Sequence, residues 1–286
     1  MKFGLFACNM GPCADPKVAA RVARAAEAAG FDSLWAGEHV VLPDPQAPPS
    51  PLPPLTAMLD PTVALGFLAA HTTTIRLGTG IIILPQRNPL VLAKELASLD
   101  VLSGGRLIFG IGIGYLEPEF AAIGVPFQDK GARSEEYLGA MLALWTMEKP
   151  RFEGRFVSFS SIQARPLPAQ KPHPPIVFGG HTPAAYSRAV RLAQGWYGFA
   201  LDLERTKASI GGVRSACERE GRRFEDMEIS VTPTPERDRV LLDRDAAERF
   251  AALGVGRLIV YAPRARDEAS LLTLIDEAEK RLIGKV

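Results

Sequence analysis

Two kinds of hydrophobic spacing alternate along the chain. Short, nearly continuous apolar runs are typical of strands buried on both faces of a parallel sheet, whereas apolar residues every three or four positions, such as Val18, Val22 and Ala26, are typical of helices. The short runs predict strands at residues 2–7, 31–36, 75–84, 106–112, 175–178, 195–199, 227–232 and 256–261. The periodic segments predict helices at about residues 16–29, 60–71, 89–102, 130–147, 183–194, 204–220, 243–253 and 267–283.

Four of the predicted helices begin with the same local signal. Asp15, Asp60, Asn88 and Thr182 each precede a proline, which places a capping side chain before a residue suited to the first helical turn. Eight alternating strand–helix units over 286 residues predict the α/β class and a (β/α)8 TIM barrel, formed by one domain that spans residues 1–286. In such a barrel the active site lies at the carboxyl ends of the strands.

Two segments do not fit the regular alternation. Residues 43–54, after the second strand, contain seven prolines and predict a loop at the catalytic mouth. Residues 149–174 predict an insertion before the fifth strand, with a small hairpin at the sequence FEGRFVSF. Loops at the mouth, such as residues 43–54, commonly act as lids or as contacts between subunits.

Composition narrows the class of protein. The chain is 47% hydrophobic, and 33 Lys and Arg residues nearly balance 32 Asp and Glu residues, so no basic surface points to a nucleic acid. No apolar run approaches the length of a membrane span, and the N-terminal run is too short for a signal peptide. Cys8, Cys13 and Cys217 form no disulfide framework and no zinc-like spacing. We therefore expect a cytoplasmic enzyme with free thiols.

Glycines mark the ends of two consecutive strands. Gly78 and Gly80 lie in the third strand, and Gly110, Gly112 and Gly114 lie in and after the fourth. Glycine in a strand often marks the close approach of a ligand or of another backbone, so the pair predicts a flat ligand at the barrel mouth. The alternatives are a bulge at Gly80 and glycines that only relieve crowding. The fourth-strand glycines do not form a dinucleotide fingerprint, because they lie outside a first βαβ unit.

Polar candidates follow other strands. Glu38 and His39 end the second strand, where a histidine can exchange a proton with a ligand or simply bond the next loop. Gly179, Gly180 and His181 precede a capped helix, where free amides and the helix dipole favour an anion; an ordinary capped turn is the alternative. The chain contains neither the HExxH pattern of a zinc hydrolase nor the GxSxG pattern of a serine hydrolase, and we predict no metal site.

The segment IRLGTGIIILPQRNPLVLAKELASLDVLSGGRLIFGIGIGYLEPEF resembles the core signature of luciferase-like monooxygenases, and in particular the subgroup of F420-dependent oxidoreductases. AAEAAGFDSLWAGEH, RSEEYLGAMLALW, RFEGRFVSF and PLPAQKPHPPIVFGGHTPAA add to the resemblance, which covers about residues 1–200. The chain departs from many relatives at Tyr115, where they have Trp, and at Gln194, where they have Asp.

The resemblance implies a barrel that holds FMN or coenzyme F420 at the carboxyl ends of its strands. It implies a non-prolyl cis peptide bond at Gly80–Ile81 that supports the ring, and catalytic roles for Glu38 and His39 beside it. Glu119 and Arg133 match positions that shape the pocket. The implied cofactor-binding residues are Thr79, Gly80, Ile81, Gly112, Gly114, Tyr115, Phe178, Gly179, Gly180 and His181, of which the last three match the phosphate-binding turn.

On this basis we expect F420-dependent hydride transfer to or from a small organic substrate. One alternative is a monooxygenase that receives reduced FMN from a separate reductase, and a second is a non-catalytic flavin-binding protein. A flavin or F420 reductase is therefore an expected partner. Some relatives pair through barrel helices, so we also expect a homodimer. The loops after the strands show no diagnostic charge, and the sequence does not name the substrate.

Overall fold

The computed structural model describes residues 1–234, 243–263 and 265–286. Within these residues, eight parallel strands close into a barrel, because β11 pairs with β1 and β3 pairs with β5. The strands in order around the barrel are β1 (Lys2–Phe6), β2 (Ser33–Ala36), β3 (Arg76–Thr79), β5 (Leu107–Gly112), β8 (Ile176–Gly179), β9 (Gly195–Leu201), β10 (Glu228–Pro233) and β11 (Arg257–Val260). The predicted (β/α)8 barrel is confirmed.

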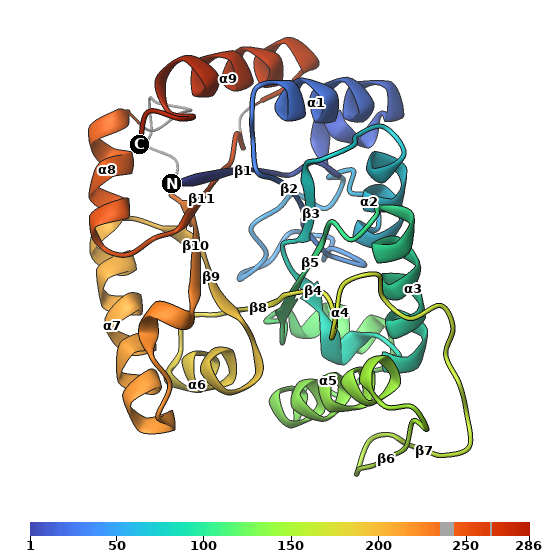
Figure 1. Ribbon diagram of the computed structural model, residues 1–286. Helices are drawn as coiled ribbons and strands as arrows, with labels where there is room; N and C mark the ends of the chain where they lie inside the picture. Colours follow the sequence, from blue (N-terminus) through green and yellow to red (C-terminus); the bar gives the residue numbers. More distant parts are fainter. Residues whose placement is uncertain (235–242, 264) are drawn as a thin grey trace.

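The helices surround the strands as an outer ring (Figure 1). They are α1 (Pro16–Ala28), α2 (Pro61–Ala69), α3 (Pro89–Leu102), α4 (Glu117–Ala122), α5 (Lys130–Thr146), α6 (Pro183–Leu192), α7 (Leu203–Glu220), α8 (Arg244–Ala252) and α9 (Glu268–Arg281). The predicted starts are confirmed, since Asp15, Asp60, Asn88 and Thr182 each accept a hydrogen bond from the first turn of their helix. The short helix α4, of less than two full turns, was not predicted from the sequence.

The third strand differs from its prediction. Residues 75–84 were expected to form one strand, but β3 ends at Thr79 and β4 (Ile82–Ile83) resumes beside β5, followed by a short 3-10 helix over Leu84–Gln86. The peptide bond Gly80–Ile81 between the two strands is cis, as the resemblance implied. A single strand was the wrong prediction because the run is apolar on both sides of the break.

Both irregular segments are confirmed. The insertion contains the antiparallel hairpin of β6 (Phe152–Glu153) and β7 (Ser158–Phe159), which projects beyond α5 in Figure 1. The proline-rich residues 43–54 form no helix or strand. Buried Asn9 ties the far end of this loop to the end of β2, because its Nδ2 donates to the carbonyls of Leu59 and Gly37, at 2.6 and 2.8 Å.

The barrel interior is filled beneath its mouth. Trp35 and Tyr197 are buried there with their rings 5.4 Å apart, and Ile108, Val177 and Ile259 pack around them. The indole of Trp35 on β2 fills the space beside the strands on either side of it. A Cβ on Gly4 of β1 would lie 2.8 Å from the indole, and a Cβ on Gly78 of β3 would lie 2.6 Å from it. The lumen is therefore a packed core, as expected for a barrel of this size. No helix in the described part of the chain is long and apolar enough to cross a membrane.

Candidate active site

Two glycines at the mouth, Gly112 and Gly179, make room for the side chain of Ile81. A Cβ built on Gly112 would fall inside the van der Waals envelope of Ile81 Cδ1, and one on Gly179 would lie 2.9 Å from the same atom. A side chain at Gly110 is excluded for a different reason, because a Cβ there would overlap the main-chain oxygen of Thr79. Ile81 is only half buried. A flat ligand at this part of the mouth would therefore meet the side chain of Ile81, which packs against the glycines of the neighbouring strands.

Aromatic rings continue this surface toward the first and last strands. The ring of Phe6 lies 5.1 Å from that of Phe199 and 5.1 Å from that of Tyr261, between centroids. A Cβ on Gly80 would lie 3.2 Å from Phe6, so the cluster adjoins the cis peptide segment. Phe199 is partly exposed at the end of β9. An apolar, aromatic surface of this kind is suited to one face of a planar ring system.

Glu38 has its carboxylate inside the protein, beneath the mouth. It accepts a hydrogen bond from the amide of Ile83 and forms an ion pair with Arg87, whose Nε lies 2.7 Å from Glu38 Oε1. Arg87 in turn pairs with Asp60. Burial raises the pKa of the Glu38 carboxyl, and the Arg87 charge only partly offsets this. Glu38 thus fixes the segment that follows Ile81 and acts as a positioning residue.

His39 belongs to a chain of three side chains. Its Nδ1 lies 3.2 Å from Glu119 Oε2, and its Nε2 lies 3.2 Å from the hydroxyl of Tyr115. Glu119 also accepts the amide of Val40. Burial alone would raise the pKa of the Glu119 carboxyl, but the hydrogen bond and charge of the neighbouring His39 outweigh it and hold that pKa below its usual range. Glu119 is therefore ionised at neutral pH.

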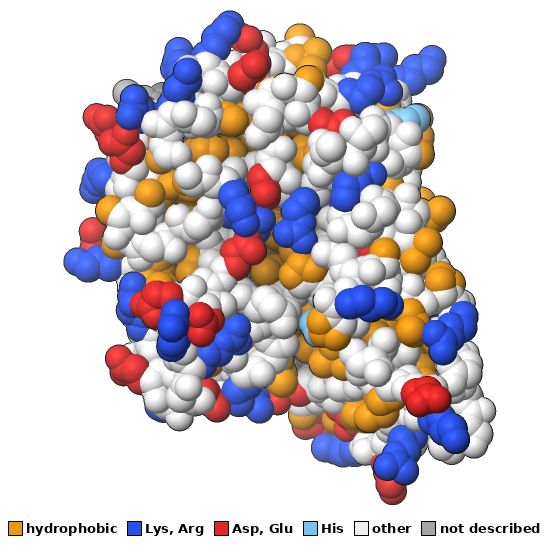
Figure 2. Space-filling model, viewed as in Figure 1, with side chains coloured by type: hydrophobic (Ala, Val, Ile, Leu, Met, Phe, Trp, Pro, Cys, Tyr) orange, Lys and Arg blue, Asp and Glu red, His pale blue; other side chains and the backbone are white. Residues whose placement is uncertain are grey.

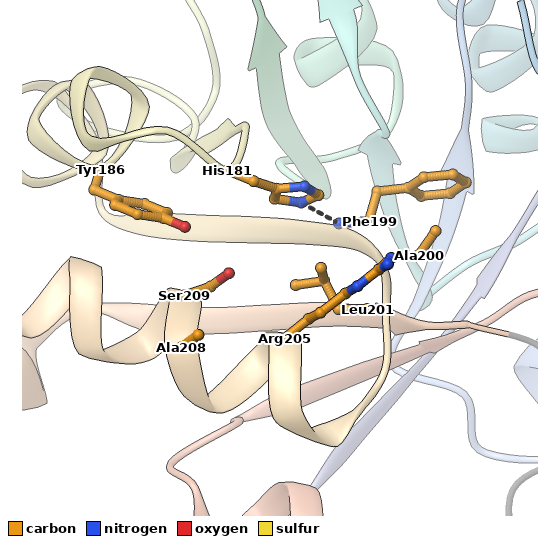
Figure 3. A pocket seen from close by; sticks show the side chains of 8 residues that line it. All are labelled: His181, Tyr186, Phe199, Ala200, Leu201, Arg205, Ala208 and Ser209. Atoms are coloured by element: carbon orange, nitrogen blue, oxygen red, sulfur yellow. Dashed lines mark hydrogen bonds between the residues drawn. The ribbon is translucent and has the colours of Figure 1, made fainter. Parts of the chain in front are cut away.

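A pocket of about 500 Å³ opens beside the turn that follows β8. Figure 3 shows His181 on one side of it and Arg205, which extends from α7 toward the end of β9, on the other. The Phe199 amide donates to His181 Nε2 at 3.3 Å. Burial and the nearby Arg205 lower the pKa of His181, so the imidazole is neutral at neutral pH and Arg205 is the cationic group of the pocket.

The main chain at this turn is suited to an anion. Gly180 has a φ of +117°, and a Cβ there would lie 2.8 Å from Ala185, so only glycine lets the turn approach the first turn of α6 so closely. Within the described residues, the amides of Gly180 and His181 find no acceptor. Free amides at a helix N-terminus, with Arg205 nearby, are chemically suited to a phosphate or carboxylate.

The structure brings most of the sequence-predicted site residues to one barrel mouth, but Glu38, Thr79 and Phe178 contribute no accessible side chain. Thr79 is buried and bonds both the amide and the carbonyl of Gly110, while Phe178 is buried in the outer core. Arg87, Phe199 and Arg205 also belong to this site and were not predicted from the sequence. Phe199 lies near the carboxyl end of β9 and Arg205 in the first turn of α7, and these positions at the barrel mouth are the signal that would have found them.

Comparison with known proteins agrees with this geometry. The family model described as luciferase-like monooxygenase matches residues 1–274. An uncharacterized protein of Mycobacterium tuberculosis is 34% identical over 263 residues, which are 88% of this chain and 89% of that one. The oxygenase component of a flavin-dependent trigonelline monooxygenase from Acinetobacter baylyi is 31% identical over 71% of this chain and 53% of its own. The coenzyme F420-dependent tetrahydromethanopterin reductase of Methanopyrus kandleri has the same fold, with a TM-score of 0.78 and 18% identity over 99% of this chain and 98% of its own.

Proposed function

The chain belongs to the luciferase-like monooxygenase family, and from this membership we propose that it is an oxidoreductase that uses coenzyme F420 to transfer a hydride to or from a small organic substrate. The observation that supports the proposal is the arrangement at the barrel mouth. An apolar surface of Ile81 and Phe199, a histidine with a polar partner on each ring nitrogen, and an anion-binding turn lie at the carboxyl ends of one set of strands.

The residues present fit a flavin-type cofactor. Ile81 and the aromatic cluster would hold the planar ring, and the amides of Gly180 and His181 would hold a phosphate. When bound, the cofactor supplies the carbon that accepts or donates the hydride. The protein orients the reactants, excludes water from the apolar mouth, and moves the accompanying proton through His39.

Arg205 favours F420 over FMN. F420 carries an acidic glutamyl tail beyond its phosphate, whereas FMN ends at the phosphate. The pocket beside the anion-binding turn offers about 500 Å³ of space and the cationic Arg205 in just that direction. A longer anionic group would find both room and a charge partner there.

A parallel titration of the purified protein with F420 and with FMN, followed by cofactor fluorescence, tests the proposal. We expect tighter binding of F420. Arg205→Ala should weaken F420 binding about tenfold, the loss of one charge-assisted contact, with a smaller effect on FMN. Arg223→Ala is the matched control, because both arginines are exposed and pair with an aspartate three positions away. Tighter binding of FMN, or an equal loss in the two variants, would contradict the F420 assignment.

The likeness to the Acinetobacter oxygenase component supports a second candidate function. Reduced FMN from a separate reductase would then activate oxygen, and the reductase would be a partner of this chain. Substrate-dependent oxygen consumption separates the two functions, because a deazaflavin activates oxygen poorly. Oxygen uptake with reduced FMN, together with weak F420 binding, would establish the second.

We also propose that the protein forms homodimers in the cytoplasm. The outer face of α2 and α3 exposes Val63 (70%), Phe67 (38%) and Val91 (56%), and Figure 2 shows hydrophobic side chains along the edge that these helices form. An apolar face of this kind is typical of an interface between subunits. The three cysteines are free and buried, as suits a reducing compartment. In size-exclusion chromatography the wild-type protein should elute as a dimer. Val63→Asp should dissociate this dimer, whereas Ile162→Asp, in the insertion, should not. A monomeric wild-type protein would refute the proposed dimer.

A further inference from the structure

Tyr115 lies between a buried ion pair and the open barrel mouth. It follows Gly114, whose φ of +74° turns the chain at the end of β5. Its own side chain is half exposed, whereas the side chains of His39 and Glu119 are 9% and 0% exposed. Its hydroxyl lies 3.2 Å from His39 Nε2, and the two rings are nearly perpendicular. A molecule in the mouth therefore meets the tyrosine hydroxyl before it meets the imidazole.

The direction of the hydrogen bonds follows from Glu119. An ionised carboxylate can only accept, so His39 Nδ1 carries the proton of that bond. In the neutral imidazole, Nε2 is then without a proton and accepts from the Tyr115 hydroxyl. The oxygen lone pairs of Tyr115 remain available to a donor in the mouth. Burial and the nearby Glu119 raise the pKa of Tyr115, so the phenol is neutral at rest.

We propose that Tyr115 is the catalytic residue that passes a proton between the substrate and the His39–Glu119 pair, and that the substrate is an alcohol or the matching carbonyl compound. In oxidation, the O–H bond of the alcohol breaks and its proton moves to Tyr115 Oη, while the proton of Tyr115 moves to His39 Nε2. The carbon that bears this oxygen loses a hydride, with its electron pair, to the coenzyme, and the C–O bond becomes C=O. Reduction is the reverse of these steps.

Glu119 stabilises the imidazolium that forms during oxidation. Its carboxylate is already bonded to Nδ1 and to the amide of Val40, so the charged pair needs no rearrangement. A substrate without an exchangeable proton at the reacting position would make no use of this chain of groups. The substrate class follows from this point, and it rests on the redox function proposed above.

The decisive variant is Tyr115→Phe, which removes only the hydroxyl; Tyr137→Phe on α5 is the matched control, because its half-buried ring packs on the outer core. With F420 and a series of 2-propanol, cyclohexanol and benzyl alcohol, we expect kcat to fall at least about a hundredfold in Tyr115→Phe, in the range of general acid–base catalysis. Coenzyme affinity should change less than about twofold.

A second readout needs no coenzyme. In protein with nitrogen-15 histidine, His39 should show the Nδ1–H tautomer, with an Nε2 signal displaced by an accepted hydrogen bond. Tyr115→Phe should move that Nε2 signal and keep the tautomer, whereas Glu119→Gln should change the tautomer. Unchanged Nε2 and kcat in Tyr115→Phe would overturn the relay, and so would a loss of kcat matched by a loss of coenzyme affinity.

The two proposals fail in different ways. If F420 does not bind, the redox proposal fails, and the nitrogen-15 signals still decide whether Tyr115 bonds His39. If F420 binds but wild-type protein oxidises none of the three alcohols and reduces none of the matching carbonyl compounds, the substrate class is overturned while the cofactor assignment stands.

Discussion

Replacing Arg87 with methionine should destabilise the protein severely, because it leaves the Glu38 carboxylate buried without its cation. The Glu38 side chain is only 1% exposed, and Arg87 is the cation that pairs with it. Met keeps the apolar stem of the arginine and removes the charge. Asp60, the second partner of Arg87, would then add its repulsion to the burial of Glu38. The same substitution would release the segment that begins at Ile83.

The size of the effect follows from the burial. Breaking a buried ion pair by removing one partner costs about 3–5 kcal/mol, since the remaining charge stays desolvated. An exposed pair gives a contrast: Arg191 and Glu135 have side chains 40% and 31% exposed, and losing their contact should cost about 0–1 kcal/mol. Arg191→Met is therefore the control.

The loss should also depend on pH with a definite sign. In the folded protein, burial raises the pKa of Glu38 above its unfolded value, and removal of Arg87 raises it further. Between the unfolded pKa, about 4.3, and that raised value, the folded variant binds a proton that the unfolded chain does not. Stability of the variant therefore recovers as pH falls through this window.

Urea denaturation at pH 8 and at pH 5.5 measures both points. We expect the free energy of unfolding of Arg87→Met, relative to wild type, to be lowest at pH 8 and to recover at pH 5.5. Adding Glu38→Gln should restore most of the loss at pH 8, because the amide still accepts from Ile83. A loss equal at both pH values and unrelieved by Glu38→Gln would refute the electrostatic explanation.

Two further predictions concern a loop anchor and the mouth. Burial raises the pKa of Glu27, but hydrogen bonds from the amides of residues 73–75 outweigh it and hold that pKa at about 2. Glu27→Gln should therefore lower the free energy of unfolding, measured by urea denaturation at pH 7, by about 1–2 kcal/mol. The loss should be small near pH 2, where the wild-type carboxylate also protonates. Gly112→Ala should displace Ile81 and weaken coenzyme binding, followed by fluorescence, at least about tenfold. The control is Gly211→Ala, in open space on α7, which should leave binding unchanged and add about 0.5–1 kcal/mol of stability. Equal affinities in the two variants would rule out Ile81 as the ring support.

The sequence predicted the architecture well because its signals are local. A buried strand is apolar over a few neighbours, and a helix start such as Asn88 accepts hydrogen bonds from residues two and three positions ahead. The same locality explains the failure at the third strand. Residues 75–84 are mostly apolar both before and after Gly80, so the hydrophobic pattern alone does not distinguish a continued strand from one interrupted there.

The candidate site was predictable only in part. The positions of Glu38 and His39 after a strand placed them at the mouth, but their different surroundings depend on the closed barrel. Glu119 and Tyr115 stand 80 and 76 positions from His39, and no spacing in the sequence predicts that the three side chains meet. Likewise, the glycines drew attention to a ligand, and only the structure shows that Ile81 fills the space beside them.

The packed lumen determines the order in which molecules enter and leave. Trp35 and Tyr197 are buried side by side below the mouth, so the described residues leave no passage along the barrel axis. A coenzyme ring placed on Ile81, as proposed above, would lie over this packed core, and a substrate would have to stack on its other face. Steady-state kinetics should therefore be compulsory-ordered: coenzyme binds first, substrate second, and product departs before the coenzyme can exchange.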